Sequence, residues 1–342
     1  MVQEPLGRLL APFTIGNKPV QQRVGAVELA SAGVGVVLGH QLLNKRKTDM
    51  IGDGQGAVRI IEPQLHRNVD VAGQGTRPGT AVPQDGGFLL SGSWSFASGI
   101  KHGSHIHTLG VIEGTGEPRI FVLPVERATL VDNWDVLGLR ATGSIDYTID
   151  SVFVPEGYTH FAVTEEPKRG GSLYTIGVVG FAVICHSAWA CGIGRRLLDE
   201  LAATVRAKAG RAGALGGSDS FQEQYAKAEA TYRSARALVY ETWRDVNETL
   251  DRGDRLSRRQ HTLMRLAMAN VTWSSHEVAM FVYKAAATTA LRAGTIQRLV
   301  RDMHAGTQHV TSSPPVYQAV GRELVGLAGD SRWQFLDLVG GE

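Results

Sequence analysis

The sequence predicts an α+β protein in three parts: N-terminal helices over residues 1–54, a central antiparallel β-barrel or sandwich over 55–165, and a C-terminal four-helix bundle over 174–342. Three observations lead to this fold class. The first part is rich in small and apolar residues, the second has short β-branched runs broken by Gly, Pro, Asn and Asp, and the third has long segments with helical spacing. Because 43% of the 342 residues are hydrophobic, the chain can bury a full core.

In the first part, residues 20–48 are predicted to be helical. The Lys and Arg residues in NKRK, near the end of this run, suit a helix C-terminus. Glycines at 25, 33, 35 and 39 are poor helix formers, so they indicate that another helix or a bound group approaches closely.

In the second part, runs such as HTLGVI, RIFVLP and YTIDSVFVP are typical of strands. The segment PQDGG at 83–87, followed by FLLSGSW, predicts a turn that leads into a strand. Glycine is enriched in the whole chain, at 41 of 342 residues. Many of these glycines fall in the turns of this part, where positive φ angles are expected.

The third part is predicted to contain three long helices at 185–209, 218–250 and 257–291, and a shorter one near 314–329. Ser218 or Asp219 is expected to cap the second helix. The polar stretch 164–173 is expected to be an exposed linker before the bundle.

Composition excludes several classes of protein. Two Cys exclude a disulfide scaffold, and a net charge of +2 does not predict binding to nucleic acid. No apolar run is expected to reach the roughly 18 residues of a membrane span. The N-terminal MVQEPLGRLLAPF lacks the pattern of a signal peptide, so a cytoplasmic protein is expected.

Three segments together carry a family resemblance: DGGFLLSGSWSFASG at 85–99, WDVLGLRATGSIDYTIDSVFVPE at 134–156, and QRLVRDMHAGTQHVTSSPPVYQAVGREL at 297–324. They resemble the acyl-CoA dehydrogenase fold superfamily. Within it they are most similar to the flavin-dependent monooxygenases, such as the oxygenase component of p-hydroxyphenylacetate hydroxylase and dibenzothiophene monooxygenase. The resemblance covers about residues 7 to 328, and it implies that roughly the first helix pair of the family is absent here.

The resemblance implies the oxygenase component of a two-component system. Such a protein takes reduced FMN or FAD from a separate NAD(P)H-flavin reductase and reacts it with O₂. A flavin hydroperoxide then hydroxylates or N-oxygenates an aromatic, polycyclic or amine substrate. The family forms homotetramers. Two other functions stay open: a flavin dehydrogenase of the acyl-CoA type, and a non-catalytic flavin-fold binding protein.

The segment WSFASG is the first candidate for flavin binding. By resemblance, Trp94 and Phe96 would wall the flavin ring, and Ser98 would contact it near N5 and take part in catalysis. From the residues alone, the same segment is also a buried strand with Ser98 capping a turn. The turn RATGS adds Arg140, Thr142 and Ser144, whose hydroxyls and backbone could hold an anion or a ring carbonyl. A plain β-turn is an equal alternative.

The C-terminal segment supplies the candidate catalytic histidine. By resemblance, His309 matches the family His that lies beside flavin and substrate and manages protons. A role at a helix end or on the surface is the alternative. The dehydrogenases can carry a Glu base where this chain has Val310, and no carboxylate lies between Asp302 and Glu323.

Further histidines and arginines complete the expected site. His40 and His304 are expected near the substrate pocket. His304 and His309 are five residues apart, which corresponds to a rotation of about 500° on a helix. The two side chains would therefore not share a face, and no metal site is expected there. The resemblance implies that three arginines hold the flavin phosphates, partly across subunits: Arg211, Arg298 and Arg301. The alternative is that they are solvated charges on the surface.

Overall fold

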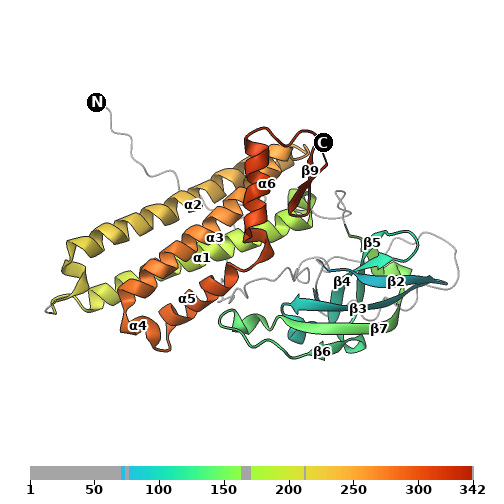
Figure 1. Cartoon of the computed structure of the whole chain (residues 1–342), viewed down its shortest axis with the longest axis horizontal. Helices are drawn as coiled ribbons and strands as arrows, with labels where there is room; N and C mark the ends of the chain where they lie inside the picture. The colour runs from blue at the N-terminus through green and yellow to red at the C-terminus, as the bar shows by residue number, and fades with distance from the viewer. Residues whose placement is uncertain (1–70, 74–76, 163–170, 212, 341–342) are drawn as a thin grey trace.

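The protein consists of a β part and a helical part that lie side by side (Figure 1). The computed structural model describes residues 71–73, 77–162, 171–211 and 213–340. The N-terminal helices expected at 1–54, and His40 with them, lie outside the described residues.

The β part is one sheet of eight strands. Across the sheet the strands follow the order β6-β7-β3-β2-β4-β5-β8, and β1 pairs with β4. The strands are β1 (Val71–Ala72), β2 (Gly79–Gln84), β3 (Gly87–Ala97), β4 (His105–Ile112), β5 (Pro118–Pro124), β6 (Thr129–Val131), β7 (Ile145–Pro155) and β8 (Thr159–Phe161).

The sheet is mixed, and the expectation of a wholly antiparallel sheet was wrong. The β2–β3 hairpin is antiparallel, but β4 runs parallel to both β2 and β1. After β3 the chain passes through a short 3₁₀ helix, Ile100–His102, and crosses to the far side of β2 instead of forming another hairpin. A strand alternates with period 2 whichever neighbour it has, so the sequence pattern cannot show such a crossover. Among the described strands no pairing closes the sheet into a barrel.

The helical part is built on three long helices that pack along one another (Figure 1). Short helices and a final hairpin follow. The elements are α1 (Gly177–Ala207), α2 (Asp219–Asp251), α3 (Arg258–Ala286), α4 (Thr288–Leu291), α5 (Thr295–Gly306), α6 (Pro314–Leu324), β9 (Arg332–Gln334) and β10 (Asp337–Val339).

The helix ends follow local capping chemistry. The Ser218 hydroxyl accepts a hydrogen bond from the backbone N–H of Phe221, as expected for the cap of α2. Ser257 and Gln260 form a capping box at the start of α3. The helix expected over 257–291 breaks instead at Ala287, which has φ 48°.

Helix α1 is more apolar than expected. The stretch Tyr174–Ala207 is long and apolar enough to cross a membrane, contrary to the expectation that no segment is. In the structure 44% of an apolar 18-residue stretch within this helix is buried inside the protein. Leu197, Leu198 and Leu201 are fully buried in the helical core, so α1 serves here as a core helix.

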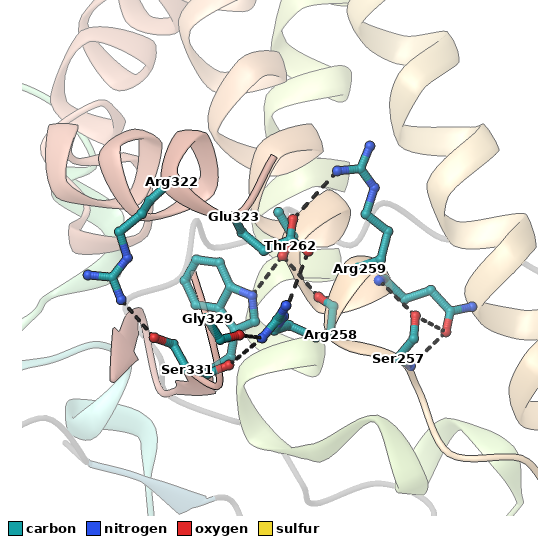
Figure 2. Close-up of polar contacts among 10 residues, drawn as sticks. Ser257, Arg258, Arg259, Thr262, Arg322, Glu323, Gly329 and Ser331 are labelled. Carbon is teal, nitrogen blue, oxygen red and sulfur yellow. Dashed lines mark hydrogen bonds and ion pairs between the residues drawn. The ribbon is translucent and has the colours of Figure 1, made fainter. Parts of the chain in front are cut away.

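The C-terminal hairpin β9–β10 was not expected, and polar contacts hold it to the helices (Figure 2). Arg258 of α3 donates hydrogen bonds to the carbonyl oxygens of Gly329 (2.6 Å) and Ser331 (2.9 Å). Arg322 of α6 donates to the Ser331 hydroxyl at 2.9 Å. The Trp333 indole N–H donates to Thr262 at 2.8 Å.

Candidate functional site

Three of the predicted site residues form a chain of hydroxyl groups. Ser98, just after β3, lies 2.7 Å from Ser144, measured between the Oγ atoms. The Ser144 Oγ lies 2.7 Å from the Thr142 Oγ1, and Thr142 donates to the carbonyl oxygen of Leu139 at 2.8 Å. Thr142 and Ser144 are buried, and Ser98 is half-buried. The structure thus brings together hydroxyls that lie 46 residues apart in sequence.

The backbone brings these two turns together. The N–H of Gly99 donates to the carbonyl of Thr142 at 2.8 Å. Gly143, with φ 51°, lets the chain turn sharply into β7. Leu139, with φ 57°, is one of the few non-glycine residues in the left-handed region, and its carbonyl also accepts the indole N–H of Trp134. Such a backbone persists only where the surroundings hold it in place.

Contacts to α5 hold the Leu139 turn in place. The backbone N–H of Leu139 donates to the Asp302 carboxylate at 2.7 Å. Gly138 lies against the backbone of α5, since a Cβ there would lie 2.2 Å from the carbonyl oxygen of Arg301. The Arg301 guanidinium donates to the carbonyl of Leu137 at 3.3 Å. A continuous path of hydrogen bonds therefore joins Ser98 in the β part to α5.

The aromatic residues of WSFASG separate into two environments. Trp94 is 1% exposed and stacks on Tyr147 with ring centroids 5.2 Å apart. It is a core residue, so the expectation that it walls a flavin was wrong and the buried-strand alternative holds for it. Phe96 is 60% exposed, with φ 66°, and makes an edge-to-face contact with Trp134. Trp134, the first residue of the second resemblance segment, was not singled out by the sequence.

His309 is held by the turn that follows α5. Its Nδ1 lies 2.6 Å from the Thr311 Oγ1 and 3.3 Å from the Thr311 backbone nitrogen. A backbone N–H only donates, so Nδ1 is an acceptor and the neutral ring carries its proton on Nε2. Burial lowers the pKa of His309 to about 4, which keeps the ring neutral near pH 7.

The sequence missed His186 on α1, which packs against His309. The two ring centroids are 4.9 Å apart and the planes are tilted by 30°. Burial, and then the charge that His309 would carry, lower the pKa of His186 to about 3. Within the described part of the chain its buried Nε2 has no hydrogen-bond partner. The only signal in the sequence was a polar residue on the apolar face of a core helix.

His304 does not join His309 in the structure. It is exposed, and its Nδ1 lies 3.0 Å from the Nε2 of His276 on α3. Burial, and then the charge of His304, lower the pKa of His276. In residues 71–73, 77–162, 171–211 and 213–340, no group of three or more His, Cys, Asp or Glu is placed to hold a metal ion.

The predicted phosphate ligands are spread over several elements. Arg140, Arg211 and Arg298 are exposed, and no side-chain partner is present for any of them among the described residues. Arg301 is half-buried in the contact with Leu137, and its Nε has no partner in the same part of the chain. Their roles in phosphate binding stay predictions.

Two hollows have linings that include none of these residues. One, of about 450 Å³, lies near the start of α5 and includes Thr288, Arg292 and Thr295 in its lining. The other, of about 410 Å³, is lined by Arg195, Tyr232, Arg233 and Arg236. Neither contains a residue that the sequence predicted for the site.

Comparison with known proteins supports the resemblance. Residues 184–314 match the family model described as acyl-CoA dehydrogenase, C-terminal domain. The chain is 32% identical over 256 residues to the indole-3-acetate monooxygenase of Pseudomonas putida, covering 73% of this chain and 65% of the relative. It is 26% identical over 274 residues to the flavin-dependent monooxygenase oxygenase subunit HsaA of Mycobacterium tuberculosis, covering 73% of this chain and 67% of that one.

A solved structure has the same fold. The crystal structure of the 3-HSA hydroxylase from Rhodococcus sp. RHA1 matches with a TM-score of 0.70 at 24% identity, covering 78% of this chain and 72% of that one. The chain spans 65% of the length of the indole-3-acetate monooxygenase that it matches. It therefore has the acyl-CoA dehydrogenase fold, and its sequence is similar to those of flavin-dependent monooxygenases.

Proposed function

We propose that the protein is the oxygenase component of a two-component flavin-dependent monooxygenase. One observation carries the proposal. The hydrogen-bonded path from Ser98 through Leu139 to Asp302 links the predicted flavin contact to the helix that leads into His309. The names of the relatives support the same activity.

The described residues fit a flavin at this position. Ser98 presents a half-buried hydroxyl at the end of β3, beside the exposed ring of Phe96. A hydroxyl and an aromatic face suit the polar edge and the flat ring of a flavin. When bound, a reduced flavin supplies the two electrons that allow one oxygen atom of O₂ to enter an organic substrate.

The protein's own residues then orient and hold protons. Ser98 would hold the polar edge of the flavin, and Phe96 with Trp134 would help to exclude water from the ring. His309 would hold a proton on Nε2 and act as a neutral hydrogen-bond donor, because its Nδ1 is already bonded to Thr311. Asp302 is committed to Leu139 and Val310 stands at the usual base position, so acyl-CoA dehydrogenation is not favoured.

We propose FMN or FAD as the flavin, delivered by a separate NAD(P)H-flavin reductase in the cytoplasm. The substrate is an aromatic, polycyclic or amine small molecule, and indole-3-acetate is the first to try because a relative bears its name. Assembly into a homotetramer also belongs to the proposal. A flavin that binds between subunits would explain why the candidate arginines are spread over several elements.

A rapid-mixing experiment tests the function. The protein is loaded anaerobically with chemically reduced FMN or FAD, mixed with O₂, and followed by flavin absorbance. We expect reoxidation with a time course different from that of free flavin, and oxygenated product when an aromatic substrate is present. Reoxidation identical to free flavin with both cofactors would rule the function out. Bleaching of bound oxidised flavin by an acyl-CoA would favour the dehydrogenase instead.

A further inference from the structure

The protons in the hydroxyl chain can point in only one direction. A carbonyl oxygen only accepts, so at 2.8 Å from Leu139 the single proton of Thr142 lies on the Leu139 side. Thr142 must then accept from Ser144, 2.7 Å away. Ser144 has thereby used its own proton, so across the next 2.7 Å it must accept from Ser98.

The Ser98 hydroxyl is consequently an acceptor towards any further group. Its proton is committed to Ser144, and its oxygen carries two lone pairs. Whatever other contacts Ser98 makes, its Oγ can bind a ligand only by accepting a hydrogen bond. Thr142 and Ser144 are 4% and 5% exposed, so water has little access to reverse the order.

This polarity distinguishes the two redox states of a flavin. Ring nitrogen N5 carries a hydrogen in the reduced flavin and donates, whereas in the oxidised flavin it has only a lone pair and accepts. An acceptor placed against N5 thus pairs with the reduced form and opposes the oxidised form. An acceptor facing an acceptor leaves both groups unpaired, which is the more costly arrangement.

We propose that Thr142 and Ser144 are positioning residues that make the site selective for reduced flavin, by fixing the Ser98 hydroxyl as an acceptor. The inference rests on the proposed function, because it needs a flavin at Ser98. It adds a cause for the choice of redox state: the Leu139 carbonyl, held by Asp302 and by the left-handed backbone, sets the direction of the whole chain.

The test measures flavin binding without turnover. Dissociation constants for oxidised and reduced FMN and FAD are determined anaerobically for the wild type, Thr142→Val, Thr142→Ser and Ser144→Ala. The matched control is Thr272→Val, another buried threonine whose hydroxyl donates to a backbone carbonyl, that of Met268. Far-ultraviolet circular dichroism and thermal unfolding confirm that each variant is folded.

The wild type should bind the reduced flavin more tightly. In Thr142→Val the Ser144 proton can turn to Ser98, whose own proton becomes available to oxidised N5. The ratio of the two dissociation constants should then fall about tenfold, the effect of one hydrogen bond. The midpoint potential of the bound flavin should fall by about 30 mV. Ser144→Ala should act similarly, while Thr142→Ser and Thr272→Val should keep the wild-type ratio.

The outcomes separate this inference from the function. If the wild type binds oxidised flavin as tightly as reduced flavin, or if folded Thr142→Val and Ser144→Ala keep the wild-type ratio, the inference is wrong while the function stands. If the wild type binds neither redox state of FMN or FAD, both are wrong.

Discussion

Replacing Asp302 by Ala tests how the hydroxyl chain is held to the helix that leads to His309. The carboxylate accepts a hydrogen bond from the Leu139 N–H at 2.7 Å, and a hydrogen bond to a charged group contributes about 1.5–3 kcal/mol. Asp302 is half-buried, so we take about 2 kcal/mol. Release of Leu139 from its left-handed conformation recovers about 1 kcal/mol. The expected net loss in the free energy of unfolding is about 1 kcal/mol.

Urea unfolding with linear extrapolation measures that loss. Hydrogen exchange at the Leu139 amide should accelerate, and the affinity for reduced flavin should fall because the Leu139 carbonyl is no longer held. Asp302→Asn keeps an acceptor oxygen and should show a smaller loss. The exposed Asp330→Ala serves as the control and should change stability by less than about 0.5 kcal/mol. Unchanged exchange at Leu139 in folded Asp302→Ala would refute the reasoning.

Three further predictions concern the histidine, the contact with α5 and the C-terminal hairpin. Since burial lowers the pKa of His309 to about 4, its ring should stay neutral above about pH 5 in an NMR titration. As the pH drops from about 6.5 to 4, His309 takes up a proton in the unfolded chain but not in the folded protein, so it lowers the free energy of unfolding over this range. His309→Gln should therefore make that decline less steep. Gly138→Ala places a Cβ 2.2 Å from the carbonyl oxygen of α5 and should cost about 1–3 kcal/mol in urea unfolding, whereas Gly157→Ala, with open space around it, should be tolerated. Arg258→Ala removes two hydrogen bonds to the segment that leads into the hairpin and should speed amide exchange in β9–β10 while the helical core keeps its protection.

The local part of the site could be predicted from sequence, because it depends on short motifs. Ser98 and Ser144 stand in turns that Gly residues mark, and both hydroxyls lie where the two turns meet. Helix caps such as Ser218 follow from the same local chemistry. Trp94 shows the limit of this reasoning: an aromatic residue in a strand serves the core or a ligand equally well until its face of the sheet is known.

The contacts between distant segments could not be predicted. Asp302 and Leu139 lie 163 residues apart, and the choice of a backbone N–H as partner leaves no trace in residue types. His186 reaches His309 only because α1 packs beside the end of α5, a pairing of helix faces that periodicity does not specify. The parallel pairing of β2 with β4 is a similar case, since it depends on where a connection crosses and not on the strands themselves.

The two predicted site residues Ser98 and His309 have opposite hydrogen-bonding roles, and backbone groups set both. The Thr311 N–H makes the His309 Nδ1 an acceptor, which leaves the proton on Nε2 and makes that edge a donor. The Leu139 carbonyl draws the hydroxyl protons towards itself, which makes Ser98 an acceptor. Backbone amides do not titrate in the physiological range, and the lowered pKa of His309 keeps its ring neutral there. Neither Ser98 nor His309 therefore changes its hydrogen-bonding role between about pH 6 and 9, so neither should make the preference for reduced flavin depend on pH, as a charged imidazole would.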